Sequence, residues 1–329
     1  HLYSIQAETK LDSLRKAFLQ SDKKQEAENT FNLAEYFFRS KNYDSAFHYV
    51  ELAEDRLKQK EENLLKGNIV KLKGNILFRQ NKPLEAIEFY KAALAIYEKI
   101  GDRDGIEAIN NNIGIIYGMI GETALSVQYL EKSAEQAALN GNRISEAKTL
   151  HNIGYHYEKR SEYNKALEYY FKALKIKQEY DNKASTASTL NNIGNIYFYT
   201  KLFDKAVEYY DLAYQIALEL NDSSDIALRL SNVAMVYKDL GKGTEAIQKM
   251  IEALAIYEKR KDIHNIARIY TALGNMLTEF DDNERSIEYF NMALKYYLET
   301  NDMARIGHCY FNIANVESAM GKKQQAIGN

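Results

Sequence analysis

Three short segments decide the fold of this chain: Asn111-Asn112-Ile113-Gly114, His151-Asn152-Ile153-Gly154 and Asn191-Asn192-Ile193-Gly194. Their glycines are 40 residues apart. The same spacing, extended in both directions, gives a column of small residues at Ala34, Gly74, Gly114, Gly154, Gly194, Ala234, Gly274 and Ala314. Two further columns, 12 and 19 residues beyond the first, also contain only Gly, Ala or Ser. A fixed period of this kind indicates an array of identical supersecondary units.

Large side chains alternate with the small columns at helical spacing. Three residues after the first small column stand Phe37, Leu77, Tyr117, Tyr157, Tyr197, Tyr237 and Leu277. Spacings of three and four residues place these side chains on the face that a helix buries. Small residues between them allow two helices to approach closely, because dense packing leaves no room for longer groups.

Turn-forming residues follow the same period and divide each unit into two helices. Breaks are predicted within units at Gly121, Ser161, Lys201, Gly241, Asp281 and Gly321, and between units at Gly101, Gly141, Asp181, Asn221, Lys261 and Asn301. The chain of 329 residues contains one proline, and proline interrupts helices. The sequence therefore predicts an all-α protein made of antiparallel helix pairs.

Composition excludes several classes of function. Lys and Arg number 43 against 46 Asp and Glu, so no basic excess favours nucleic-acid binding. Cys309 is the single cysteine, which excludes an internal disulfide framework. The longest apolar stretch, residues 113–120, is too short to span a bilayer. We expect neither a nucleic-acid partner nor a membrane span in this sequence.

No arrangement of side chains favours catalysis or a cofactor. His151 and His156 are five residues apart, so they do not share the face of a helix that a metal would need. The segment Gly241-Lys242-Gly243-Thr244 lacks the spacing of a phosphate-binding loop. The sequence predicts a protein that is not an enzyme and that binds no metal or cofactor.

Repeat five carries the family pattern most completely. Its residues Leu190, Ile193, Gly194, Tyr197, Ala206, Tyr210 and Ala213 fill the pattern large, Leu-Gly, Tyr, Ala, aromatic and Ala. The chain thus resembles the tetratricopeptide repeat (TPR) family, in a long form with 40-residue units. The resemblance covers residues 27–329, as seven complete units and a truncated eighth, and it implies a right-handed superhelical solenoid. Residues 1–26, with Leu2, Ile5 and Leu11, are interpreted as an N-terminal capping helix.

The family resemblance implies a protein–protein interaction function. Residues 10–14 followed by such repeats are also similar to the start of TPR sensor regions in Bacteroidetes signalling proteins. That similarity implies the input region of a histidine kinase or transcriptional regulator, and it favours an extracytoplasmic over a cytoplasmic location. Two alternatives are a peptide-regulated enzyme regulator of the Bacillus aspartate-phosphatase type and a purely structural assembly scaffold.

Asparagines recur on one side of the first helix of each unit. They stand at the sixth position (Asn32, Asn112, Asn152, Asn192, Asn232 and Asn312) and at the ninth (Asn75, Asn195, Asn275 and Asn315). In TPR folds this side lines the concave groove. Asparagine forms helices poorly, and its amide both donates and accepts, so the pattern favours binding of a peptide backbone. An equally weighted interpretation is that the amides join neighbouring helices.

The predicted groove is centred on units three to five. Tyr155, Phe198 and Tyr199 would add apolar contacts there. Farther toward the N-terminus, Lys71, Asn75, Asn112 and Lys148 occupy four of the five positions with which some TPR domains hold a C-terminal carboxylate, and Asn152 stands where the family has arginine. The loss of that bidentate group should weaken the grip on a carboxylate.

Overall fold

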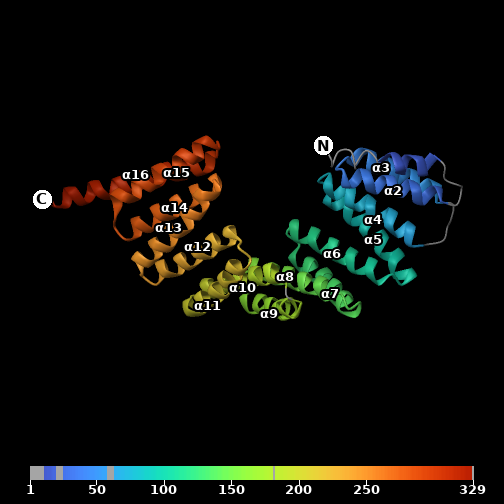
Figure 1. The fold of residues 1–329 in the computed structure, drawn as a ribbon, viewed down its shortest axis with the longest axis horizontal. Helices are drawn as coiled ribbons and strands as arrows, with labels where there is room; N and C mark the ends of the chain where they lie inside the picture. Colours follow the sequence, from blue (N-terminus) through green and yellow to red (C-terminus); the bar gives the residue numbers. More distant parts are fainter. Residues whose placement is uncertain (1–10, 20–24, 58–62, 181, 328–329) are drawn as a thin grey trace. The chain divides into compact units, whose positions relative to one another are not determined.

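The computed structural model describes residues 11–19, 25–57, 63–180 and 182–327, and all regular structure in these ranges is helical (Figure 1). The first helices of the repeats are α2 (Glu26–Arg39), α4 (Leu64–Arg79), α6 (Arg103–Met119), α8 (Arg143–Lys159), α10 (Lys183–Tyr199), α12 (Ser223–Asp239), α14 (Ile263–Glu279) and α16 (Met303–Ile327). The second helices are α3 (Tyr43–Arg56), α5 (Pro83–Ile100), α7 (Thr123–Leu139), α9 (Tyr163–Glu179), α11 (Phe203–Glu219), α13 (Gly243–Arg260) and α15 (Asn283–Glu299). Consecutive helices pack as antiparallel pairs, which confirms the predicted all-α repeat array.

The array divides into two compact units. The N-terminal unit contains residues 1–176 and the C-terminal unit residues 177–329, with the boundary inside α9. Each unit is described by itself below.

A left-handed residue ends the first helix of every complete repeat. These residues are Lys41, Asn81, Gly121, Ser161, Lys201, Gly241 and Asp281, with φ between 59° and 86°. A left-handed residue at this point closes the last turn by satisfying carbonyl groups that the helix leaves unpaired. Gly101, Gly141, Asn221, Lys261 and Asn301 do the same between repeats, whereas Asp181 lies outside the described residues. The structure confirms every predicted break among these residues, and Lys41 and Asn81 extend the pattern to the first two repeats.

Side-chain caps begin the next repeat. The carboxamide of Asn142 accepts a hydrogen bond from the backbone N–H of Ser145, and Asn182 and Asp262 cap the residues three positions on in the same way. Such caps satisfy N–H groups that have no partner within the helix. Repeats therefore start where the sequence places Asn or Asp.

The predicted break at Gly321 is wrong. Helix α16 continues through Gly321 as far as Ile327, and it is the longest helix in the part of the chain that the structure describes. In the other repeats the reversal at this position is stabilised by a long second helix that packs back on the first. At Gly321 the chain instead keeps the helical hydrogen bonds of α16, since glycine alone does not end a helix unless a reversed segment packs against the preceding one.

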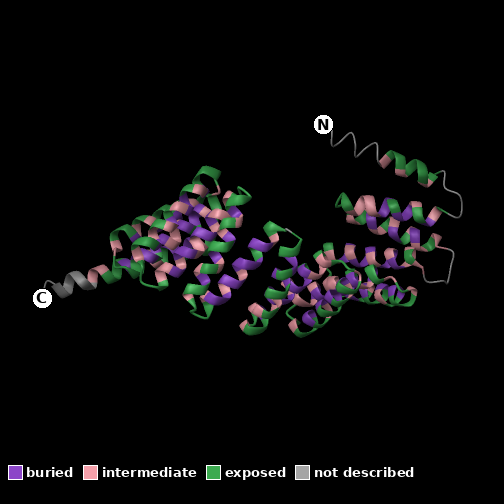
Figure 2. Cartoon of the chain, turned by 60° about the horizontal axis from the view of Figure 1, so that its bottom comes forward, coloured by how far each residue is buried: buried purple, intermediate pink, exposed green. Residues whose placement is uncertain are grey.

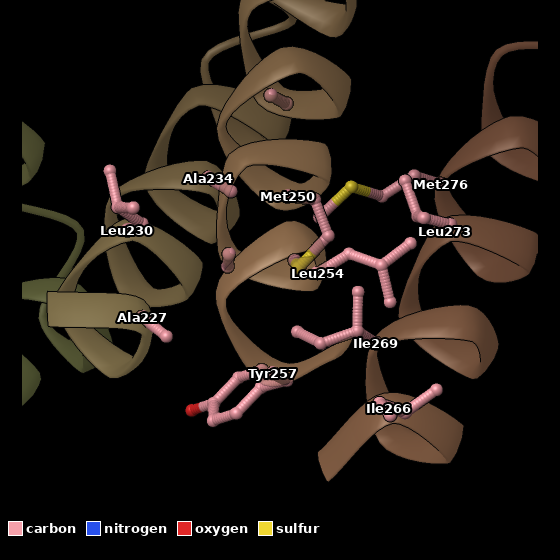
Figure 3. Close-up of a cluster of buried hydrophobic side chains, with 12 residues drawn as sticks. Ala227, Leu230, Ala234, Met250, Leu254, Tyr257, Ile266, Ile269, Leu273 and Met276 are labelled. Carbon is pink, nitrogen blue, oxygen red and sulfur yellow. The ribbon is translucent and has the colours of Figure 1, made fainter. Parts of the chain in front are cut away.

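The core of each repeat forms where a small residue faces a large one. A Cβ placed on Gly154 would lie 2.7 Å from the ring of Tyr170, and one on Gly194 would lie 2.6 Å from the ring of Tyr210. Buried residues accordingly follow the facing sides of the helices, as the purple segments of Figure 2 show. Figure 3 shows the same arrangement in the C-terminal unit, where Met250 and Leu254 of α13 face Ile269 of α14.

Residues 11–19 are helical and lie against the first repeat. The side-chain amide of Asn29 donates to the carbonyl oxygen of Ala17 at 3.2 Å, and the ring of Phe18 meets the ring of Tyr49 edge-on. These contacts suit a capping helix, whose full extent over residues 1–26 stays a prediction. Leu2 and Ile5 lie outside the described residues.

Candidate functional site

The predicted groove residues occupy one side of the first helices. We call this side the first-helix face and define it by the second, fifth, sixth, ninth, twelfth and thirteenth positions of each repeat. The N-terminal unit carries Lys71 and Asn75 on α4, Asn112 on α6, and Lys148, Asn152 and Tyr155 on α8. The C-terminal unit carries Asn192, Asn195, Phe198 and Tyr199 on α10, and Asn232 on α12.

Two of the asparagines at the ninth position, Asn75 and Asn195, bind tyrosines of their own repeat. The hydroxyl of Tyr90 donates to Oδ1 of Asn75 at 2.8 Å, and the hydroxyl of Tyr210 donates to Oδ1 of Asn195 at the same distance. Burial raises the pKa of Tyr90, so this hydroxyl remains a donor at neutral pH. The two amides thus join the first helix of a repeat to its second helix, as the structural interpretation of the asparagines expects.

We expect the Tyr210→Phe variant to lose about 1 kcal/mol of unfolding free energy, because it removes the donor to Asn195 and leaves the ring in place. Urea titration followed by circular dichroism measures this loss. In a double-mutant cycle with Asn195→Ala, the two effects should be less than additive, since each change breaks the same bond. Fully additive losses would show that the amide acts independently of the hydroxyl.

A sixth-position amide joins two neighbouring first helices, α10 and α12. Nδ2 of Asn232 on α12 donates to Oδ1 of Asn191 on α10 at 2.7 Å, and Asn191 is buried. Two aromatic side chains on this face are exposed: Tyr155 is 44% exposed and Tyr199 is 53% exposed. Phe198 is half-buried and packs against Phe203 of the paired helix.

Lys71 and Lys148, the two lysines of the predicted carboxylate-binding site, have different environments. Nζ of Lys71 donates to Oδ1 of Asn68 at 3.0 Å, and burial lowers the pKa of Lys71 although Asp102 and Glu35 act in the opposite direction. Lys148 is exposed on α8. Asn112 and Asn152 are half-buried on their helices. A buried ammonium favours an anionic partner, because an opposite charge compensates its lost hydration.

Two cavities open on the first-helix face of the C-terminal unit. The larger, of about 410 Å³, is lined by residues of α12, α14, α15 and α16: Met235, Lys238, Ala272, Asn275, Met276, Thr278, Glu279, Phe290, Asn312, Asn315, Val316 and Ala319. The smaller, of about 140 Å³, shares Met235 and Ala272 with the larger and extends toward Asn232 and Arg268. Cavities of the larger size are typical of ligand sites.

Sequence reasoning missed these cavities. It centred the groove on repeats three to five, whereas the cavities lie in repeats six to eight. Two departures from the repeat pattern could have indicated them. Ala272 occupies the sixth position, which is asparagine in most repeats, and Phe290 occupies the position of Tyr90 and Tyr210. The asparagines alone gave no indication of where the side chains leave space.

Histidines contribute to packing. Nε2 of His156 lies 3.2 Å from the hydroxyl of Ser126, which donates to the carbonyl oxygen of Gly114, and burial lowers the pKa of His156. Within the described ranges no group of three His, Cys, Asp or Glu side chains is placed to hold a metal ion. No helix in those ranges combines the length and the apolar character that crossing a bilayer requires.

Family comparisons identify the repeat. A tetratricopeptide repeat model matches residues 66–138 and 145–219, and a model of the soluble NSF attachment protein (SNAP) family matches residues 185–329. No curated protein matches the chain.

Solved structures share the fold at low sequence identity. The apo form of RapI is 16% identical, with 96% of this chain and 93% of RapI covered and a TM-score of 0.73. The apo quorum sensor NprR from B. thuringiensis is 15% identical, with 98% and 90% covered and a TM-score of 0.65. A tetratricopeptide repeat protein from Parabacteroides merdae is 17% identical, with 87% and 99% covered and a TM-score of 0.58. These similarities show the fold.

Proposed function

Because the chain is a tetratricopeptide repeat protein, we propose that it binds a peptide or a partner helix on its first-helix face. The observation that supports this most directly is that two cavities open on that face between first helices. Each is lined by a mixture of apolar and amide side chains, which suits a peptide with its alternating apolar groups and polar backbone.

The proposed context is the input region of a bacterial signalling protein. Two proteins with this fold are described as sensors: the quorum sensor NprR, and a signal transduction ATPase from Pyrococcus horikoshii with a tetratricopeptide repeat sensor. The alternative, a peptide-regulated enzyme regulator, is supported by the shared fold of RapI and of an aspartyl phosphate phosphatase from Bacillus subtilis. Addition of the chain to a phosphorylated response regulator separates the two, because only the alternative expects faster loss of phosphate.

Peptide binding is tested with the whole chain. A phage-displayed library of random peptides is panned against it, and the dissociation constants of enriched peptides are measured by fluorescence anisotropy. We expect binding to weaken about tenfold when an amide pair on the face is replaced, either Asn112 and Asn152 or Asn192 and Asn232, each by alanine.

The control replaces exposed second-helix residues, with Gln128, Glu168 and Glu208 changed to alanine. These changes should leave binding intact, and melting curves verify that every variant folds. Equal binding by all these variants would show that none of the four replaced amides contacts the peptide.

A further inference from the structure

Repeat seven differs from repeats two and five at one contact. All three contain a Gly-Asn pair at positions eight and nine, in which the glycine packs against a ring on the second helix. That ring is Tyr90 or Tyr210 in repeats two and five, where its hydroxyl binds the asparagine. In repeat seven it is Phe290, which has no hydroxyl and is 1% exposed. Asn275 instead lines the larger cavity, where its Oδ1 accepts a long hydrogen bond of 3.4 Å from Asn312.

Two alanines create the space beside Asn275. Ala272 occupies the sixth position, which is asparagine in six of the other repeats. Ala319 occupies the thirteenth position, where the other repeats have Arg39, Arg79, Met119, Lys159, Tyr199, Asp239 and Glu279. The cavity therefore results from side chains that are shorter than their counterparts in the same array.

The lining of the larger cavity is apolar with an amide rim. Met276, Phe290 and Val316 provide apolar surface, whereas Asn275, Asn312 and Asn315 provide carboxamide groups. Its two charged residues, Lys238 and Glu279, bind each other at 2.8 Å. A neutral lining of this kind favours an uncharged apolar side chain, with the amides left to bind a peptide backbone.

The smaller cavity, which adjoins the larger one, has a positively charged side chain in its lining. Arg268 lines the smaller cavity, is exposed on α14, and donates to Oδ1 of Asn265 at 3.1 Å. Among the described residues no carboxylate lies within ion-pair distance of Arg268. A guanidinium beside an apolar cavity is well suited to bind a carboxylate, because it can donate two parallel hydrogen bonds.

We propose that the groove along α12, α14 and α16 binds an extended peptide that buries one large apolar side chain between α14 and α16 and places a carboxylate against Arg268. This inference rests on the proposed function and specifies the chemistry of its partner. The carboxylate is either an acidic side chain or the C-terminus of the peptide.

The test uses the random peptide library panned on the whole chain, displayed both with free C-termini and with internal random segments. We expect enriched peptides to share a large apolar residue and a carboxylate, at the C-terminus or as Asp or Glu. Their affinity should fall about tenfold or more in Ala272→Leu, which fills the cavity, and in Phe290→Tyr, which gives Asn275 the tyrosine partner it lacks. Because Gly274-Asn275 matches the pairs that already accommodate tyrosine, Phe290→Tyr should fold normally.

Charge reversal adds a specificity test. The Arg268→Glu variant should bind the enriched peptides about tenfold or more less tightly. It should prefer versions of these peptides in which lysine replaces the acidic residue. Ala304→Leu and Lys295→Glu, at exposed positions outside the cavities, are the matched controls and should change nothing.

The outcomes separate this inference from the proposed function. Peptides that bind Ala272→Leu, Phe290→Tyr and Arg268→Glu as tightly as the parent chain, yet lose affinity when Asn112 and Asn152 are replaced, would overturn the inference and leave the function standing. If no peptide is enriched, both proposals fail.

Discussion

We expect the Gly194→Leu variant to lose about 3 kcal/mol of unfolding free energy, because the new side chain would overlap a ring that cannot move. A Cβ on Gly194 would already lie 2.6 Å from the ring of Tyr210. That ring is 2% exposed, and its hydroxyl is bound to Asn195. The variant must either separate α10 from α11 or break this hydrogen bond. Urea titration followed by circular dichroism measures the loss.

Gly307→Leu is the matched control on α16. A Cβ at Gly307 would meet no atom within 4 Å, so leucine there adds only its better helix propensity. We expect this variant to gain up to about 1 kcal/mol. A similar loss in both variants would show that helix packing does not account for the small column.

A second large effect is expected at Lys177, which is buried in the C-terminal unit. Its side chain is 6% exposed, and Nζ donates to the hydroxyl of Thr189 at 2.7 Å. The equivalent position in the other repeats holds Leu57, Tyr97, Ala137, Ala217, Tyr257 or Tyr297. Burial lowers the pKa of the Lys177 ammonium to about 8. The folded state therefore carries this charge at neutral pH only at a cost.

We expect Lys177→Met to raise the unfolding free energy at pH 7 by about 2 kcal/mol. The lowered pKa corresponds to a penalty of about 3 kcal/mol for the buried charge, which methionine removes. Methionine also loses the hydrogen bond to Thr189, and this loss cancels about 1 kcal/mol of the gain. Lys175→Met, on an exposed position of the same helix, should change stability little.

The pH dependence gives the sign of this effect. In the unfolded chain lysine stays protonated up to about pH 10.4, whereas folded Lys177 loses its proton near pH 8. The unfolded state therefore binds more protons between these values, and the parent protein should gain stability from Lys177 as the pH rises through this window.

The difference in unfolding free energy between the Lys177→Met variant and the parent protein should consequently shrink between pH 7 and about pH 9.5. Subtracting the two unfolding free energies removes the contribution of tyrosine titration, because the tyrosines titrate in both proteins. A difference that stays constant with pH would mean that folded Lys177 keeps its proton throughout this window, so that burial does not lower its pKa.

Features that repeat along the chain could be predicted from the sequence. The glycine of repeat four packs against Tyr170 and that of repeat five against Tyr210, in keeping with the close helix approach that the column of small residues predicted. The left-handed residues at Gly121 and Gly241 lie where the turn residues predicted them. Such features depend on local backbone sterics and on packing between adjacent helices, which act alike in every repeat.

The role of each asparagine could not be predicted in this way. Asn75 and Asn275 occupy the same position, yet Asn75 binds Tyr90 and Asn275 lines a cavity. The difference arises from Phe290, which lies on the paired helix 15 residues farther along the chain. The break predicted at Gly321 does not occur for a related reason, because a left-handed turn persists only where the reversed segment finds a surface to pack against.

The sequence alone determined the helical class, the 40-residue period, the helix pairs and the side of the first helices that carries the asparagines. Only the tertiary structure decided which of these amides are engaged within the fold, where a cavity remains and which lysines are buried. The physical reason is that a period reports what every repeat shares, through short-range sterics and the burial of apolar faces. A binding site depends on the departures from that period, and their effect on space and charge is set by side chains from several helices at once.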